Sequence, residues 1–391
     1  MRIAVFHNRY IHRGGEDAAV DLDVELLLKA GHDVRLFAVD SRELGTVTDR
    51  MRAGANARWN GAIVARVKRF LADHPAEVGH VHNFFPILTP AVHFTLHRAG
   101  IPVVQSLHNY RLFCANGLFL RDGRPCEDCV TRGPWNAVRY GCYRDSRLQT
   151  ALWADATAHH RRRGTWNDLV DRFITPGDFA RRKLAAAGLP EDRIVVRPNP
   201  VLDPGEPRFG GRGAVYVGRL SPEKGVWLLL DAWRRLGGAP LCIVGTGPEE
   251  EAMRAAATDL PNIRFTGLLS PEAVRKELAQ ASFAVIPSLW YEIAPLVASE
   301  AMAAGRPVVA AHPTALTDIV DDGRTGLHFR VGDAESLAQV CRRLLTDTGE
   351  AIAMGREARQ VYEERFAPDR CLDALLSIYQ ELIDGRSRRQ R

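Results

Sequence analysis

The chain alternates short apolar segments with helical patterns along almost its whole length, and this alternation restricts the folds open to it. In the first half, segments rich in β-branched residues run from RIAVFH (2–7) to RIVVRP (193–198). In the second half they run from AVYVGR (214–219) to GLHF (326–329). Segments of helical periodicity separate them. Strands that alternate with helices form parallel sheets. We therefore predict an α/β chain with two doubly wound, Rossmann-like domains.

A segment rich in proline and glycine, RPNPVLDPGEPRFGGRG (197–213), separates the two halves and is typical of a hinge. We place an N-terminal domain at 1–199 and a second domain at 200–367. Residues 368–391 form an amphipathic helix followed by a basic tail, which we expect to be frayed. Two such domains on a hinge imply a cleft faced by the carboxyl ends of both sets of strands.

Composition is that of a soluble globular protein, with 46% hydrophobic and 25% charged residues. No apolar run reaches the roughly 18 residues of a membrane span. The N-terminus, MRIAVFHNRY, has neither the apolar core nor the cleavage site of a signal peptide. We therefore expect a cytoplasmic protein.

Charge is distributed unevenly between the halves. Residues 1–200 hold 29 Lys and Arg against 21 Asp and Glu, whereas residues 201–391 hold 23 against 26. The basic first half could attract a phosphorylated acceptor or the anionic inner face of a membrane. A solvated, Arg-rich surface explains the same excess, and both interpretations stay open.

The stretch FAVIPSLWYEIAPLVASEAMAAGRPVVA (283–310) ends a buried strand and opens a helix. Pro295 suits the first turn of that helix, and the amides that follow it lack intrahelical partners. These amides favour an anion. Glu292 stands before this anion site and Glu300 lies one and a half turns inside the helix. Glu292 could simply be an acid at a helix N-terminus. Glu300 has no cation among its neighbours three and four residues away, so a salt bridge within its helix is excluded.

Two further loops carry features suited to a diphosphate. In GRLSPEKG (218–225), Gly218 allows close backbone approach, and Arg219 and Lys224 place two cations after a strand. Solvated surface charge is the alternative. Gly14 and Gly15 lie between the first strand and its helix, where they let the backbone approach a ligand or simply form a turn.

Histidines also mark the strand ends. His108 closes the strand PVVQSLH, on the side where an open α/β sheet binds ligands. It could contact a sugar hydroxyl or a developing charge, or it could be a satisfied core histidine. His80 and His82 alternate along one strand, and we assign both a structural role.

Four of the seven cysteines fall within a stretch of 29 residues: Cys114, Cys126, Cys129 and Cys142. Cys126 and Cys129 form a CxxC unit. In a cytosolic protein disulfides are disfavoured, and a tetrahedral structural zinc site becomes plausible. Reduced or redox-active thiols are the alternative. The excursion that carries these cysteines (109–145) interrupts the N-terminal domain.

These features together resemble the retaining glycosyltransferases of the GT-B fold, family four, also called group 1. The resemblance covers nearly the whole chain and is strongest over 213–311. Its most specific element is E-x7-E, here Glu292 to Glu300 followed by AMAAGRPVVA. Two departures are Ala294–Pro295 where a glycine is common, and Asn109 where many members have Asp.

The resemblance implies roles for individual residues. Glu292 would contact the donor sugar, Glu300 the nucleotide ribose, and Arg219 and Lys224 the diphosphate. His108 would act in catalysis together with Glu292, Arg219 and Lys224. The resemblance also implies that domain 1–199 binds the acceptor, that domain 200–367 binds the nucleotide sugar, and that the last helix crosses back to the N-terminal domain. The donor site would be completed by glycine loops, by the FTGL segment and by the backbone before and within the helix: Gly14, Gly15, Gly218, Gly267, Leu268, Ile293, Ala294, Pro295, Leu296 and Val297.

We therefore predict a retaining hexosyltransferase that moves a sugar from a UDP- or GDP-sugar to an acceptor hydroxyl. No cofactor is expected for catalysis, and zinc would be structural. The acceptor could be a glycan, a phosphorylated or lipid-linked sugar or a small molecule, and the protein could associate peripherally with the inner membrane face. Alternatives are a GT-B-like nucleotide-sugar epimerase or a phosphorylase. A basic, zinc-containing nucleic-acid-binding protein is a further alternative, but no recognition element supports it, so no nucleic acid is expected.

Overall fold

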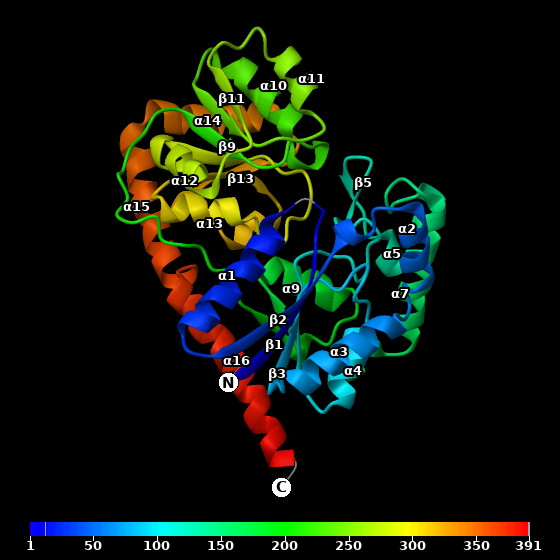
Figure 1. Cartoon of the computed structure of the whole chain (residues 1–391). Helices are drawn as coiled ribbons and strands as arrows, with labels where there is room; N and C mark the ends of the chain where they lie inside the picture. Colours follow the sequence, from blue (N-terminus) through cyan, green and yellow to red (C-terminus); the bar gives the residue numbers. More distant parts are fainter. Residues whose placement is uncertain (12, 390–391) are drawn as a thin grey trace. The chain divides into compact units, whose positions relative to one another are not determined.

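The computed structural model describes residues 1–11 and 13–389, and Figure 1 shows the chain coloured along its length. Contacts divide it into two compact units. The first comprises Met1–Phe119, Cys126–Pro200 and Cys371–Arg391, and the second comprises Leu120–Pro125 and Val201–Arg370. The chain passes from one unit to the other within the hinge segment expected from the sequence, at Pro200.

The first unit is built on one parallel sheet of six strands in the order β2-β1-β3-β4-β7-β8. All six strands fall on segments predicted from β-branched patterning. They are β1 (Arg2–Arg9), β2 (Asp33–Asp40), β3 (Val78–Val81), β4 (Val103–Ser106), β7 (Arg172–Thr175) and β8 (Ile194–Val196). Its helices are α1 (Gly15–Lys29), α2 (Val47–Ala55), α3 (Gly61–Asp73), α4 (Ala91–Arg98), α5 (Asp128–Thr131), α6 (Asn136–Tyr140), α7 (Arg147–Arg162), α8 (Thr165–Leu169) and α9 (Asp178–Ala186).

The last helix, α16 (Pro368–Arg389), completes the core of the first unit. Leu375, Ile378 and Tyr379 recur at helical spacing and are buried against Ile3 and Val5 of the central strand β1. The Arg-rich segment that we expected to be frayed continues the helix to Arg389, and residues 390 and 391 lie outside the described residues.

The second unit repeats the architecture, with six parallel strands in the order β11-β10-β9-β12-β13-β14. Helices α10 and α14 pack on one face and α12 and α13 on the other, as Figure 1 shows. The strands are β9 (Ala214–Val217), β10 (Leu241–Val244), β11 (Ile263–Gly267), β12 (Phe283–Ile286), β13 (Val308–His312) and β14 (Gly326–Arg330). The helices are α10 (Val226–Leu236), α11 (Glu250–Ala256), α12 (Pro271–Gln280), α13 (Leu296–Ala303), α14 (Ala334–Thr346) and α15 (Thr348–Arg365).

The structure corrects three local expectations. Pro295 does not lie in the first turn of its helix, because its ψ of 117° is extended and it caps α13, which begins at Leu296. Strand β4 ends at Ser106, so His108 follows the strand rather than closing it. Helical periodicity in the sequence also predicts a helix near 56–72, but this helix begins only at Gly61, where the Asn60 side chain accepts a hydrogen bond from the Ile63 amide.

The cysteine-bearing excursion contains a two-stranded hairpin, β5 (Leu120–Arg121) and β6 (Arg124–Pro125), that we did not predict. Asp122 and Gly123 between the strands both have positive φ, which is the geometry of the tight hairpin turns that favour Asp-Gly. Within the described ranges, no helix combines the length and the apolar character needed to span a bilayer.

Candidate active site

In the second unit, β9 and β12 lie side by side in parallel, so the loops after them meet at one edge of the sheet. The contact between these loops requires a glycine. Gly225 has φ of +70°, and a Cβ there would lie 1.9 Å from the carbonyl oxygen of Pro287. The Leu289 amide also donates to the Glu223 carbonyl oxygen at 2.9 Å. Lys224 is thereby fixed beside the segment that leads to Glu292.

The central pair of the site is Lys224 with Glu292. The Lys224 Nζ lies 2.6 Å from Oε1 of Glu292, and the Ser288 hydroxyl donates to the same oxygen at 2.7 Å. The carboxylate side chain is only 5% exposed, whereas the lysine is 25% exposed. The ammonium also lies 5.4 Å from the centre of the Trp290 ring. A buried carboxylate is thus held between a cation and a hydroxyl, and the cation still reaches solvent.

Trp290 and Glu300 are less well partnered. The indole Nε1 of Trp290 is buried and has no hydrogen-bond partner in the described part of the chain. Burial raises the pKa of Glu300, and Arg275 of α12 partly opposes that rise. The sequence excluded a cation from Glu300's own helix, and Arg275 on the neighbouring helix acts on its carboxyl group electrostatically. A buried polar atom such as Trp290 Nε1 is normally hydrogen-bonded, so this N–H can donate to an external acceptor.

The backbone after Glu292 leads to the start of a helix. The segment from Glu292 to Pro295 leads directly into α13, with Ile293 buried and Ala294 partly exposed. Leu296 and Val297 form the first turn of α13, whose early amides have no carbonyl partner within the helix. The N-terminus of α13 therefore presents donors next to the Lys224–Glu292 pair.

Glycines at the neighbouring strand ends bring the loops into close contact. Arg219 follows Gly218 and its side chain is exposed. A Cβ on Gly245 would lie 2.0 Å from the Gly218 carbonyl oxygen, and one on Gly247 would lie 2.2 Å from the Leu220 carbonyl oxygen. We did not single out Gly245 and Gly247, although the GTG sequence directly after β10 was an available signal.

The predicted base-contact segment lies at the end of β11. Gly267 adopts φ of +71°, and Leu268 is 80% exposed. Because the Leu268 side chain is so exposed, a ligand can contact it.

In the first unit, His108 is held by His82. The His82 Nδ1 lies 3.0 Å from His108 Nε2, and the two rings stack at 5.3 Å. Burial lowers the pKa of both imidazoles, and for His108 the Glu16 carboxylate partly offsets the effect. Both are therefore neutral near pH 7. We had assigned His82 a structural role only; it also fixes the ring of the predicted catalytic histidine.

His80 extends this arrangement into the core. Its Nε2 lies 2.8 Å from the Ser106 hydroxyl and its Nδ1 lies 2.6 Å from the Tyr379 hydroxyl. Those contacts satisfy both ring nitrogens, which agrees with a structural role.

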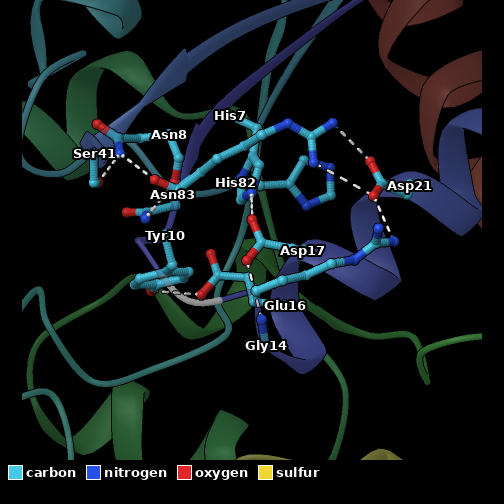
Figure 2. A network of polar contacts seen from close by, with 12 residues as sticks. His7, Asn8, Tyr10, Gly14, Glu16, Asp17, Asp21, Ser41, His82 and Asn83 are labelled. Atoms are coloured by element: carbon cyan, nitrogen blue, oxygen red, sulfur yellow. Dashed lines mark hydrogen bonds and ion pairs between the residues drawn. The ribbon is translucent and has the colours of Figure 1, made fainter. Parts of the chain in front are cut away.

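Gly14 and Gly15 form the start of α1, beside the buried contact between His7 and Asp17. Gly14 caps α1, its amide donates to Asp17 at 3.2 Å, and Asp17 lies 2.8 Å from His7 Nε2 (Figure 2). Burial raises the pKa of Asp17, but the bonds from His7 and Gly14 outweigh it and leave that pKa below its usual value. A Cβ on Gly14 would meet nothing within 4 Å, so packing does not explain the glycine.

None of the four clustered cysteines is disulfide-bonded in the described part of the chain, and Cys114, Cys126 and Cys142 act electrostatically on Cys129. Burial is the main cause that raises the pKa of Cys129 to about 12, and Cys114, Cys142 and Cys126 add to it. Backbone amides point at the Cys114 and Cys129 sulfurs, which lowers the pKa of each slightly. Within the described residues, no three His, Cys, Asp or Glu side chains are arranged to hold a metal ion. Structural zinc remains a prediction.

The site residues thus fall into two groups. Those from Gly218 to Glu300 gather at one sheet edge of the second unit, whereas Gly14, Gly15 and His108 belong to the first unit.

Comparison with known proteins agrees with this architecture. The family model "Glycosyl transferases group 1" matches residues 211–347, and the model "Glycosyl transferase 4-like domain" matches residues 14–200. Among solved structures, sucrose-phosphate synthase from Thermosynechococcus elongatus aligns with a TM-score of 0.70 at 17% identity, covering 98% of this chain and 99% of the other. HepE from Anabaena, solved with UDP and glucose, aligns with a TM-score of 0.71 at 14% identity, covering 97% and 100%. Both likenesses define the fold as GT-B.

The chain is also similar in sequence to characterised glycosyltransferases. Phosphatidyl-myo-inositol mannosyltransferase of Mycobacterium leprae is 26% identical over 90% of this chain and 89% of its own length. Sulfoquinovosyl transferase of Arabidopsis thaliana is 34% identical, but over only 38% of this chain and 30% of its own length. The chain belongs to the group 1 glycosyltransferases.

Proposed function

We propose that this glycosyltransferase takes a sugar from a nucleoside diphosphate sugar and transfers it, with retention of configuration, to an acceptor hydroxyl. The observation that carries the proposal is the Lys224–Glu292 pair beside the N-terminus of α13, with Glu300 inside the same helix. Cations, amide donors and two carboxylates at one sheet edge match the parts of such a donor, namely two phosphates and two hydroxyl-bearing rings.

Each group has a role in this proposal. Lys224, Arg219 and the amides at the start of α13 hold the diphosphate and stabilise its charge as it leaves. Glu292 and Glu300 accept hydrogen bonds from the donor sugar and from the ribose. The orphan Nε1–H of Trp290 is a further donor for an oxygen of the ligand.

The reaction breaks the bond between the anomeric carbon and the diphosphate oxygen and forms one from that carbon to the acceptor oxygen. The electron pair of the broken bond stays on the diphosphate, and the acceptor proton passes to a phosphate oxygen. Attack on the face from which the phosphate leaves gives retention. Lys224 and Arg219 favour departure because negative charge grows on the diphosphate.

UDP is the donor base we propose to test first. HepE, which shares the fold, has been solved with UDP and with UDP-glucose. GDP-sugars are the second choice. We place the enzyme in the cytoplasm, where it could meet a lipid-linked acceptor at the inner membrane face.

The decisive experiment measures nucleotide release from a panel of UDP-, GDP- and ADP-sugars, with Glu300→Ala in parallel. Release from one donor, lost in the variant, is the expected result. If no sugar nucleotide of the panel releases its nucleotide and no nucleotide shifts the thermal unfolding temperature, the proposal is contradicted. The anomeric configuration of the product, measured by NMR, tests retention separately.

A further inference from the structure

The first unit contains a pocket directly beside His108. Its lining is divided about evenly between aromatic or aliphatic residues and polar ones, so the pocket can contact both the apolar and the hydrogen-bonding parts of a small molecule. The aromatic members are Phe84, Phe85, Trp153 and Trp166, and the polar members that matter here are Glu16, His82, His108, Asn109, Arg111 and His160.

Most of the charge in this pocket is neutralised or absent. Burial lowers the pKa of His82 and His108, and lowers that of His160 to about 4, so all three imidazoles are neutral at pH 7. The Arg111 guanidinium lies 5.6 Å from the ring centres of both Phe85 and Tyr143 and donates to the Ala115 carbonyl oxygen at 3.3 Å. That cation is therefore engaged with the wall of the pocket.

Glu16 is the anionic group of the pocket, and neutral donors hold it. The Tyr10 hydroxyl donates to Oε2 of Glu16 at 2.7 Å, as Figure 2 shows. The Asn109 amide nitrogen lies 3.4 Å from the same oxygen and 3.2 Å from the Tyr10 oxygen. Burial, with Glu16 nearby, raises the pKa of Tyr10 well above its usual value, so the phenol stays a donor.

The Asn109 side chain, which contacts Glu16 through its nitrogen, is also held through its oxygen. The Arg111 amide donates to the Asn109 side-chain oxygen at 2.9 Å, which turns the Asn109 NH₂ toward Glu16. Both donors contact Oε2, and none of the described residues donates to Oε1, so that oxygen can accept from a ligand. The Asn109 that departs from the family pattern thus helps to place a carboxylate contributed by α1.

We propose that this pocket binds the acceptor, that Glu16 accepts a hydrogen bond from one of its hydroxyls, and that the preferred acceptor is an uncharged sugar or polyol. The inference rests on the proposed transferase function. A hydroxyl satisfies Oε1, and the aromatic walls fit the apolar face of a sugar ring. A phosphate group at the same place would face the Glu16 carboxylate, which repels it, while the Arg111 guanidinium of this pocket is held against Ala115, Phe85 and Tyr143. The basic first half of the sequence suggested a phosphorylated acceptor; the pocket favours the opposite.

The test uses the full chain with the donor identified by nucleotide release. Aryl and alkyl glycosides of glucose, galactose, mannose and N-acetylglucosamine are compared with the 6-phosphates of the same sugars. The readout is the ratio of sugar transferred to acceptor to sugar lost by hydrolysis. We expect transfer to a neutral glycoside and a ratio at least tenfold lower in Glu16→Gln. In the same variant, the ratio of transfer to hydrolysis should differ less between neutral and phosphorylated acceptors than it does in the wild type.

Glu25→Gln is the matched control, because Glu25 lies on the same helix in an exposed pair with Lys29, outside the pocket. It should keep the wild-type ratio. Thermal unfolding followed by circular dichroism shows whether each variant is folded. Preference for the phosphates, transfer to neither set, or an unchanged ratio in folded Glu16→Gln would overturn the inference. If the wild type hydrolyses no nucleotide sugar at all, the proposed function itself fails.

Discussion

Lys224 and Glu292 are 68 residues apart in the sequence, yet their charged atoms lie 2.6 Å from each other. The pairing follows from the adjacency of β9 and β12, whose following loops each supply one member. It leaves the carboxylate aligned while the ammonium keeps part of its surface exposed. A ligand phosphate can therefore contact the cation without displacing the pair.

The first prediction concerns Lys224. Lys224→Ala should lower kcat about 10²- to 10³-fold, the range seen when one preorganised donor to a developing charge is removed. Donor binding should weaken less, because Arg219 and the α13 amides remain. Steady-state kinetics with the identified donor would check the difference. Equal losses in kcat and in donor affinity would instead assign Lys224 to ground-state binding.

The second prediction concerns nucleotide binding by Glu300. Glu300→Ala should weaken nucleotide binding about tenfold or more, the cost of losing a hydrogen bond to a charged group. Titration calorimetry measures this directly, and unchanged affinity would refute the ribose role.

Glu300 also predicts a pH dependence. Burial raises the pKa of this carboxyl in the folded state. The folded protein therefore holds the proton more tightly than the unfolded chain, and stability falls as pH rises through the shifted pKa. Glu300→Gln should raise the unfolding free energy of the unliganded protein at neutral pH and have no such effect in acid. Urea unfolding of both proteins at several pH values would test this prediction. A lower unfolding free energy of Glu300→Gln at neutral pH would contradict it.

The buried histidines of the first unit predict loss of stability in acid. Burial lowers the pKa of His93 and of His160 to about 4. The unfolded chain then binds protons more readily, so stability present at neutral pH is lost as pH falls below about 6.5 toward 4. His93→Gln should flatten that slope in urea titrations. His97→Gln, at an exposed position of the same helix, is the matched control.

Arg197 and Asp23 form a buried, bidentate pair at 2.6 and 2.9 Å within the first unit. Asp23→Asn should cost roughly 3–5 kcal/mol of unfolding free energy, because it leaves a buried guanidinium without its counter-charge. The paired change Asp23→Leu with Arg197→Met should recover much of that loss. Chemical denaturation of the three proteins would check both statements, and a double variant as unstable as Asp23→Asn would contradict the second.

The cysteine prediction is settled by metal analysis. If Cys114, Cys126, Cys129 and Cys142 hold zinc, purified protein should contain close to one zinc per chain, and Cys126→Ser should lower that content. Cys242→Ser, in the second unit, is the control. A folded wild-type protein without metal would rule the zinc site out.

Much of the architecture could be predicted from the sequence, because most of the twelve sheet strands are buried apolar runs between helical patterns. The β5–β6 hairpin escaped prediction because two-residue strands carry no periodicity. Only its Asp122–Gly123 turn could have marked it. Likewise, Pro295 matched the preference for a first-turn position but adopts the extended geometry of a cap.

The candidate site was predictable in its members but not in their pairing. The E-x7-E spacing and the GR…K loop identified Glu292, Glu300, Arg219 and Lys224. Their contacts depend on which strands are neighbours, and that is a property of the whole sheet. His82 illustrates the same limit: its alternation with His80 indicated a buried strand, but its bond to His108 requires β3 and β4 to be adjacent.

The packing of α16 has a consequence for biosynthesis. The first unit buries Leu375, Ile378 and Tyr379 of that helix against β1, although the whole second unit lies between them in the chain. As the polypeptide leaves the ribosome, the sheet of the first unit emerges before the second unit but lacks part of its core until α16 has been made. The second unit has its complete sequence by Arg370. The part of the protein that is translated first is therefore the last that can finish folding.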